Sequence, residues 1–324
     1  MRHSNHGLRI ALLAGVSAVA ITAAAPSAGA ADLNKPVPMK APPALPVAKD
    51  TWTWWIEGGA FNTSGGTVSF GPIGGIKPGW GPEGAVGFDW QPFAPMHVVG
   101  QFRYGSASKS GGAFNFAGST PSGGSSFNVA GSQHIREDHW LIDFGIGRDF
   151  GLGNSNAMWT LGIRVADLRA KLTASGNFTA TTFTPPSGGG ASVKNVIKGS
   201  FSTEQKTSFI GAGPRFGVQG DIPLGNQWSI DWLAGAAVLF GERSVTLSVP
   251  AVTSFGASVS DTAAVFNVDA QAGLSYWFTP ATKITASYRF DGYFKALKTV
   301  DSNVNPTNID RFYSGPMLRL TTKF

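Results

Sequence analysis

The chain has no cysteine and few charged residues. Among its 324 residues cysteine is absent, and charged residues make up 14%. The lack of cysteine excludes disulfide bonds, cysteine-based zinc sites and a thiol nucleophile. The net charge of +6 is a mild excess without a basic stripe, so we expect no nucleic-acid partner.

Long hydrophobic runs are also lacking beyond the first 30 residues. The longest later stretch, around Leu233 to Phe240, is short and contains Gly235. A helix that crosses a bilayer needs about 20 consecutive apolar residues, which excludes a helical membrane protein. Glycine and aromatic residues, by contrast, are abundant, with 43 Gly, 10 Trp and 23 Phe. A membrane β-barrel is compatible with this composition, because only alternate residues of its strands face lipid.

The first 50 residues contain two segments that lie outside any folded domain. Residues 1–30 have the layout of a signal peptide, with basic Arg2 and Arg9, an apolar run, and small residues that predict cleavage after Ala30. Residues 31–50 are rich in proline and show no periodicity, which predicts an extended periplasmic linker. The barrel is expected to occupy residues 51–324.

From Trp52 onward the dominant pattern is the two-residue period of β-strands. Between Phe266 and Phe278, apolar side chains alternate strictly with small and polar ones. Strands of soluble sandwiches are usually about 5 to 6 residues long, so this length favours a lipid-facing strand. The pattern predicts an all-β, up-and-down antiparallel transmembrane barrel of ten strands, with twelve or eight as alternatives. The predicted strands are 51–61, 83–91, 96–105, 138–150, 157–170, 206–219, 228–240, 266–278, 283–294 and 310–324.

The connections between these strands alternate in length. Residues 92–95, 151–156, 220–227 and 279–282 are short connections, whereas the intervening ones are long. Outer-membrane barrels have short periplasmic turns and long extracellular loops, so both ends of the barrel should lie in the periplasm. Residues 241–265 alternate without a clear turn, and we expect a hairpin above the membrane there. Seven of the ten tryptophans lie beside a chain end or short connection, as in a periplasmic aromatic girdle: Trp52, Trp54, Trp55, Trp90, Trp159, Trp228 and Trp277.

The same alternation assigns charged residues to the inside of the barrel, because a lysine or arginine facing lipid costs about 2 to 4 kcal/mol near the midplane. The predicted lumen-lining residues are Glu83, Arg103, Asp143, Arg164, Arg215, Asp231, Asp269, Arg289, Asp291 and Arg319. Lys323 is expected on the same face.

The turn positions predict which inward charges are level with each other, because register follows from the centre of a hairpin. Three acid–arginine pairs result: Glu83 with Arg103, Asp143 with Arg164, and Arg215 with Asp231. A fourth hairpin sets Asp269 near Asp291, with Arg289 placed to bridge them.

Two functions fit a narrow barrel with such an inner face. The charges can line a constriction that selects small solutes, and inward small residues such as Gly211, Gly213 and Gly217 favour a water path. Alternatively, the charges only stabilise a sealed barrel whose long loops bind a surface partner. An enzyme is less expected: His134, Glu137, Asp138 and His139 are the one candidate cluster, and no phosphate loop or metalloprotease motif is present. We expect no cofactor, no metal site and no catalytic residues.

Several stretches resemble the Legionella-type major outer membrane protein family. They are GIRVADLRAKL (162–172), GAGPRFGVQGDIPLGNQWSIDWLAGAAVLFGE (211–242), VDAQAGLSYWF (268–278), ASYRFDGYF (286–294) and SGPMLRLTTKF (314–324). The mature start ADLNKPVPMKAPP (31–43) is similar to that of alphaproteobacterial outer-membrane proteins. The resemblance is best in the C-terminal half.

This resemblance implies a pore-forming protein of the Gram-negative outer membrane. Its expected partners are outer-membrane lipid, lipopolysaccharide and small solutes, and a final aromatic residue like Phe324 implies insertion by the barrel assembly machinery. Some members of the family contain cysteine, whereas this chain does not, so the resemblance implies no disulfide-linked assembly.

Overall fold

The computed structural model describes residues 51–69, 75–119, 124–152, 155–184, 192–249, 255–300 and 305–324. The expected signal peptide and linker therefore lie outside the described residues. Within the described ranges, no helix is long and apolar enough to cross a membrane.

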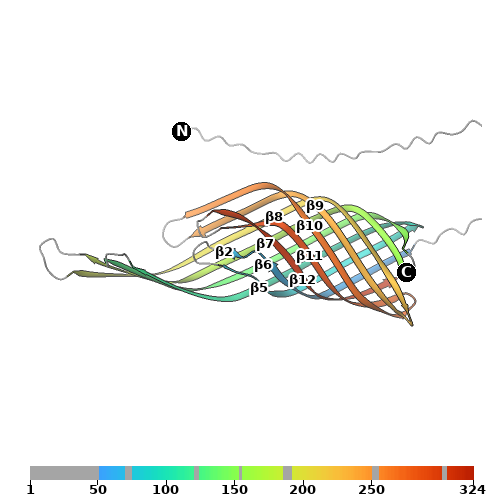
Figure 1. Cartoon of the computed structure of the whole chain (residues 1–324), viewed down its shortest axis with the longest axis horizontal. Coiled ribbons are helices and arrows are strands. Elements are labelled where there is room, and N and C mark those ends of the chain that lie inside the picture. The colour runs from blue at the N-terminus through green and yellow to red at the C-terminus, as the bar shows by residue number, and fades with distance from the viewer. Residues whose placement is uncertain are drawn as a thin grey trace, which may run out of the picture. The chain divides into compact units, whose positions relative to one another are not determined.

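Ten long strands form one closed antiparallel barrel (Figure 1). They are β1 (Thr51–Gly65), β4 (Trp80–Phe93), β5 (Met96–Ser119), β6 (Ser125–Leu152), β7 (Ser155–Thr184), β8 (Val193–Gly225), β9 (Trp228–Val249), β10 (Phe255–Thr279), β11 (Thr282–Val300) and β12 (Pro306–Lys323). The short strands β2 (Val68–Ser69) and β3 (Gly75–Ile76) pair only with each other. Strand β1 closes the ring by pairing with both β4 and β12. The prediction of ten strands is confirmed. Residues 241–249 continue β9 and residues 255–265 continue β10, and these two continuations pair with each other.

Side chains alternate between a lipid-facing and a lumen-facing side along each barrel strand. On β7, Leu161 and Ile163 are exposed to the outside, whereas Arg164, the residue after Ile163, is fully buried. The exposed apolar side chains form the band that lipid covers, because only apolar groups are stable against hydrocarbon. The buried residues of all ten strands fill the interior.

The end of the barrel with short turns carries a partial aromatic girdle. Trp52 stacks on Trp54 and Trp90 at ring-centroid distances of 5.9 and 5.3 Å. The terminal Phe324 joins this end, because its backbone N–H donates to the carbonyl of Trp52 at 2.8 Å. Two tryptophans differ from the girdle prediction. Trp55 and Trp277 face the interior, where they contact Arg319 and Lys283.

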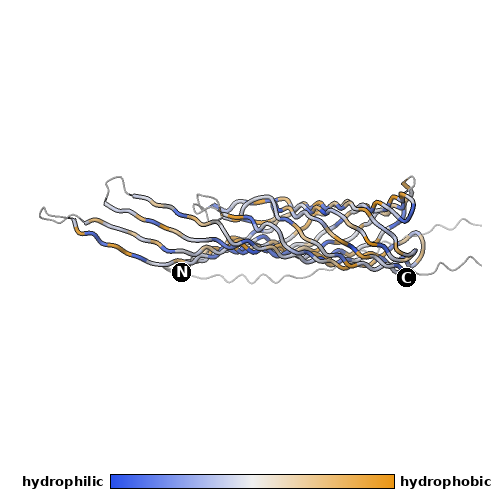
Figure 2. The backbone as a smooth tube through the Cα atoms, turned by 90° about the horizontal axis from the view of Figure 1, so that it is seen from below, coloured by the Kyte–Doolittle hydropathy of each residue, from blue (hydrophilic) through white to orange (hydrophobic). Residues whose placement is uncertain are grey.

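At the opposite end, four strands continue beyond the rest of the barrel (Figures 1 and 2). Pairing of β4 with β5 stops at Gly105, while β5 and β6 stay paired to Ser119. Likewise β8 leaves β9 at Glu204 but pairs with β7 as far as Val193. We call the part of β5–β8 beyond these points the outer sheet. Its strands are much longer than predicted.

Apolar side chains fill the outer half of the barrel interior. Phe61, Leu168, Phe209 and Leu239 are each 0% exposed there, in one continuous cluster. The end of β11 contributes to this core because a register shift between Tyr293 and Leu297 carries residues 296–300 inward. Ser69 of β2 holds this segment by donating hydrogen bonds to the Thr299 hydroxyl and the Val300 carbonyl, at 2.9 and 2.6 Å.

Candidate functional site

All ten charged residues predicted from the sequence lie on the inner face, and nine of them join one cluster at mid-height. Glu57 completes this cluster, which we call the trans-lumen network. Its members are Glu57, Glu83, Arg103, Asp143, Arg164, Arg215, Asp269, Arg289, Asp291 and Arg319. Five acids thus meet five arginines, so the network has no formal net charge. The tenth predicted residue, Asp231, lies nearer the end of the barrel with short turns, where it pairs with Lys283 at 2.6 Å.

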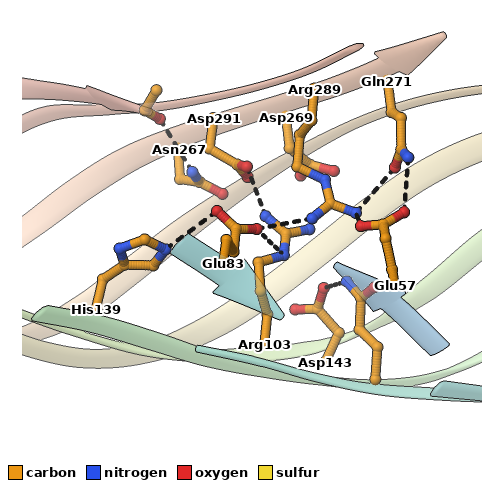
Figure 3. A network of polar contacts seen from close by, with 12 residues as sticks. Glu57, Glu83, Arg103, His139, Asp143, Asn267, Asp269, Gln271, Arg289 and Asp291 are labelled. Atoms are coloured by element: carbon orange, nitrogen blue, oxygen red, sulfur yellow. Dashed lines mark hydrogen bonds and ion pairs between the residues drawn. The ribbon is translucent and has the colours of Figure 1, made fainter. Parts of the chain in front are cut away.

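Arg103 and Arg289 connect opposite walls of the barrel (Figure 3). The Arg103 Nη1 atom of β5 contacts Asp291 of β11 at 2.5 Å, and its Nε lies 3.3 Å from Glu83. Strands β5 and β11 are separated by three strands on one side of the ring and five on the other. Arg289 in turn donates to Glu83 at 2.7 Å and pairs with Glu57. These bonds therefore run through the lumen rather than along its wall.

Arg164 and Arg215 form the second half of the network. The Nε and Nη2 atoms of Arg164 bind both oxygens of Asp143 at 2.6 Å, and its Nη1 reaches Asp269 on β10 at 2.8 Å. Arg215 binds the other oxygen of Asp269 at 2.8 Å. Gly235 leaves the space for this contact, because a Cβ there would lie 2.7 Å from the Arg215 guanidinium.

The predicted pairings are partly wrong. Asp143 is opposite Arg164 as expected, and Asp269 is opposite Asp291. Arg215, however, is opposite Ala237 and does not contact Asp231. The error arises because β8 continues through Pro223 to Gly225, which moves the turn centre to Asn226 and Gln227. Arg289 does not bridge Asp269 and Asp291. Arg103 binds Asp291, and Arg164 and Arg215 bind Asp269.

Strand alternation separates the four residues of the expected catalytic candidate. His134 and Asp138 face outward, and His134 bonds the Ser110 hydroxyl at 2.8 Å. Glu137 and His139 face inward, at 0% and 3% exposure. There Glu137 accepts a hydrogen bond from Tyr313, and the His139 ring stacks on Tyr313 at 4.2 Å. The two histidines thus lie on opposite faces of β6 and do not converge.

Several residues that face the interior were not predicted from the sequence. Glu57 closely follows Trp54 and Trp55 and precedes two glycines. Tryptophans on both faces of β1 hide the alternation of polar and apolar residues there. Gln271 and Asn267 are neutral, yet they bind Arg289 at 3.0 Å and Arg164, respectively. Their inward position on β10 was the signal that could have identified them.

A cavity of about 780 Å³ lies between the trans-lumen network and the end of the barrel with short turns. We call it the short-turn vestibule. Its lining includes His97, held between Asp89 at 2.8 Å and Asp149 at 3.1 Å. Arg319 lies 4.3 Å from the Trp55 ring centroid at its inner end. In the described part of the chain, no group of three or more His, Cys, Asp or Glu side chains is arranged to hold a metal ion.

This geometry can block the lumen. Eight of the ten network residues are at most 8% exposed. Their ion pairs join strands that are not neighbours in the ring, such as β5 with β11 and β7 with β10. Taking such charges out of water costs several kcal/mol each, and the cost is offset only when every charge has close partners. The five arginines and five acids meet that condition through mutual contacts, and the apolar core lies directly beyond them.

The family of the chain follows from a match to residues 102–324. This segment matches the family described as Legionella pneumophila major outer membrane protein precursor. The chain belongs to this family. It is accordingly an outer-membrane β-barrel protein, and the expected family is confirmed. No curated protein matches the chain.

Solved structures with a similar strand arrangement include three outer-membrane proteins. The protease OmpT from Escherichia coli is 12% identical, over 85% of this chain and 97% of its own, with a TM-score of 0.45. The Ail protein of Yersinia pestis is 12% identical over 84% and 99%, with a TM-score of 0.28. The Pseudomonas putida toluene transporter TodX is 9% identical over 85% and 89%, with a TM-score of 0.19.

Proposed function

We propose that this outer-membrane protein is a closed barrel whose function lies in its outer sheet, which binds apolar partners at the cell surface. The observation that carries the closed lumen is the chain of ion pairs across it, from Glu57 through Arg289, Glu83 and Arg103 to Asp291. A solute would have to separate these buried pairs and then displace the apolar core of the outer half.

The outer sheet supports the second part of the proposal. Several of its large apolar side chains are exposed, although they lie beyond the lipid-covered band. They are Phe127, Phe183, Val193, Val196 and Ile197, each at least 40% exposed. Phe127, Val193 and Ile197 share one face of the sheet, and Phe183 and Val196 lie on the other. Exposed apolar surface of this kind on a folded protein is typical of an interaction site. Within the described residues the sheet also carries a strand edge, because β8 beyond Glu204 pairs there with β7 alone.

Partitioning of whole cells into hexadecane tests the proposed binding surface. Cells that display the native chain are expected to partition into hexadecane more than cells with Phe127→Ser, Val193→Ser and Ile197→Ser together. A matched control carries Asn128→Ser, Thr181→Ser and Asn195→Ser on the same sheet and should behave like the native chain. Equal partitioning of the native chain and the apolar-to-serine variant would overturn the proposal.

Passive diffusion of small solutes, the function expected from the sequence, is a second candidate. The short-turn vestibule favours it, because the lining of this cavity extends inward to Arg319 of the trans-lumen network and to Gln271, which contacts that network. In this case the inward arginines and acids would select the solute. Swelling of liposomes in arabinose separates the candidates: a pore accelerates swelling, and a closed barrel leaves it at the rate of protein-free vesicles.

We further propose that the protein has no enzymatic activity. The opposite orientation of His134 and His139 supports this, since a general base and its partner need to lie within hydrogen-bond reach. Replacing both histidines with alanine should leave the hydrolysis of peptide and ester substrates at the background rate of the native protein. A hydrolytic activity that the native chain has and the variant lacks would contradict the proposal.

Export and assembly complete the proposal. The signal peptide layout supports cleavage after Ala30, and N-terminal sequencing of the mature protein should begin at Ala31. The seam between Phe324 and Trp52 supports insertion by the barrel assembly machinery through the C-terminus. Deleting Phe324 should lower the amount of folded protein in the outer membrane, measured by its heat-modifiable mobility on gels.

A further inference from the structure

We propose that the outward faces of β6, β7 and β8 form a binding site for the phosphorylated glycolipid of the outer leaflet. The site consists of Arg136, Lys171 and Lys206. The proposal rests on the outer-membrane location and on the outward faces of these strands. It does not depend on whether the lumen is closed.

The three cations lie in one row across adjacent strands. Arg136 of β6 is the register partner of Lys171 on β7, and Lys171 is the register partner of Lys206 on β8. Neighbouring strands lie about 4.8 Å apart, so the row places three cationic side chains within about 10 Å. Arg169, two positions from Lys171 on the same face, extends the row toward the membrane.

The row lies just beyond the lipid-covered band of the same strands. On β7 the outward position next to Arg169 is Asp167, which Arg169 covers, and the positions below it are Val165 and Ile163, which is 60% exposed. On β8 the register partner of Asp167 is Ile210, at 50% exposure. A ligand at this boundary can place acyl chains on the apolar side chains and an anionic headgroup on the cations. This combination fits a phosphorylated lipid better than a soluble anion.

The carboxylate side chains near the row are less exposed than the cationic side chains that bind them. Glu204 is held by Lys171 at 2.6 Å and Lys206 at 2.7 Å, and its side chain is 28% exposed against 50% and 64% for the lysines. Arg136 covers Asp138 in the same way, at 56% against 31%. The acids therefore orient the cations, while further N–H donors of each cation face outward. Arginine and lysine donors of this kind are the usual protein ligands of phosphate groups.

The neighbouring strands lack such a row. Thr246 of β9 is the register partner of Lys206, and Ser258 of β10 is the register partner of Thr246. The outward positions nearer the membrane on these two strands hold Ser244, Glu242, Ser260 and Thr262. The inward-facing Arg243 of β9 is 8% exposed and binds Asp261. Among the described residues of β6–β10, the outward cations at the membrane boundary are thus gathered on β6–β8. An asymmetric cluster is expected of a lipid-binding site rather than of a general solubilising rim.

Binding of purified lipid A to the full chain in detergent micelles tests the site. The variant carries Arg136→Gln, Lys171→Gln and Lys206→Gln, and its control carries Lys109→Gln, Lys194→Gln and Lys198→Gln. Both change the net charge by the same amount, but Lys109 lies on the opposite face of the sheet, and Lys194 and Lys198 lie farther out on β8. We expect the first variant to bind bisphosphorylated lipid A at least tenfold more weakly, because each cation near an anionic lipid surface contributes to affinity. The control should bind as the native chain does.

The choice of lipid identifies the ligand. The native chain should bind dephosphorylated lipid A and phosphatidylglycerol more weakly than bisphosphorylated lipid A. Binding of dephosphorylated lipid A or of phosphatidylglycerol as tightly as bisphosphorylated lipid A, an equal loss in both variants, or no loss in the first variant would overturn the proposal. Heat-modifiable mobility checks that each variant is folded. If the triple variant does not fold, Lys171→Gln replaces it, with Lys194→Gln as control and an expected loss of about fivefold.

Discussion

At the scale of single residues, Arg164 shows how the interior is held together. Its side chain is fully buried and binds Asp143 of β6 together with Asp269 and Asn267 of β10. Arginine suits this position because its planar guanidinium presents several donors in fixed directions. Without Arg164, Asp143 would keep Gln101 and the Nε atom of Arg215 at 3.4 Å, and Asp269 would keep Arg215 as its ion-pair partner.

Replacing Arg164 with methionine should lower the free energy of unfolding by about 3 to 5 kcal/mol, since it leaves two buried carboxylates poorly compensated. Urea unfolding of the protein in lipid vesicles measures this loss. Arg136→Gln serves as the control, because Arg136 forms an exposed pair worth about 0 to 1 kcal/mol. Equal effects of the two substitutions would contradict the structural role of Arg164.

Glu204 provides a pH-dependent prediction outside the membrane. Its hydrogen bonds to Lys171 and Lys206 lower the pKa of this carboxyl below its ordinary value of 4.5. A lowered pKa in the folded state means that the contribution to stability is present above the pKa of the unfolded chain. This contribution is lost as the pH falls through the lower pKa of the folded state.

Substituting both lysines with methionine should raise the pKa of Glu204, because the favourable hydrogen bonds and charges are removed. An NMR titration of the carboxyl carbon measures the change. The Lys194→Met and Lys198→Met variant is the matched control and should leave the midpoint unchanged. A midpoint that stays low without Lys171 and Lys206 would show that other groups set this pKa.

At the scale of elements, the short-turn ends of the strands were predictable except on β8, and the opposite ends were not. Turns after Phe93 and Thr279 lie within the predicted connections, because lipid-facing alternation continues almost to those turns. Beyond the membrane both faces of a strand meet water, so alternation disappears. Strand β8 from Val193 to Thr203 illustrates this, with apolar and polar residues on both faces. The predicted start at residue 206 coincides with the membrane boundary.

The outer sheet should be separable from the barrel. Replacing residues 111–133 and 174–203 by Asn-Gly turns leaves Ser110 opposite His134 and Thr173 opposite Glu204, which are register partners in the native fold. The shortened chain should keep heat-modifiable mobility and the native urea midpoint, because the trans-lumen network and the apolar core remain. Failure of this chain to fold would show that the outer sheet is part of the folding core.

At the scale of the whole molecule, the sequence predicted the barrel and the inward face well, but not the state of the lumen. Membership of the inner face follows from the high cost of charges in lipid, which acts on each residue separately. Contacts across the lumen, such as Arg103 with Asp291, depend on the barrel radius and on side-chain length. Neither follows from alternation along one strand. The inward path of residues 296–300 was equally hidden, because it depends on a bulge near Lys295.

Single-channel recording in a planar lipid bilayer directly tests whether side chains close the lumen. Native protein, folded by the criterion of heat-modifiable mobility, is inserted into a bilayer in potassium chloride, and current is recorded at moderate voltage. We expect a current baseline without discrete conductance steps, because the ion pairs and the apolar core leave no continuous water path through the barrel. Reproducible steps of uniform size from the native chain would contradict it.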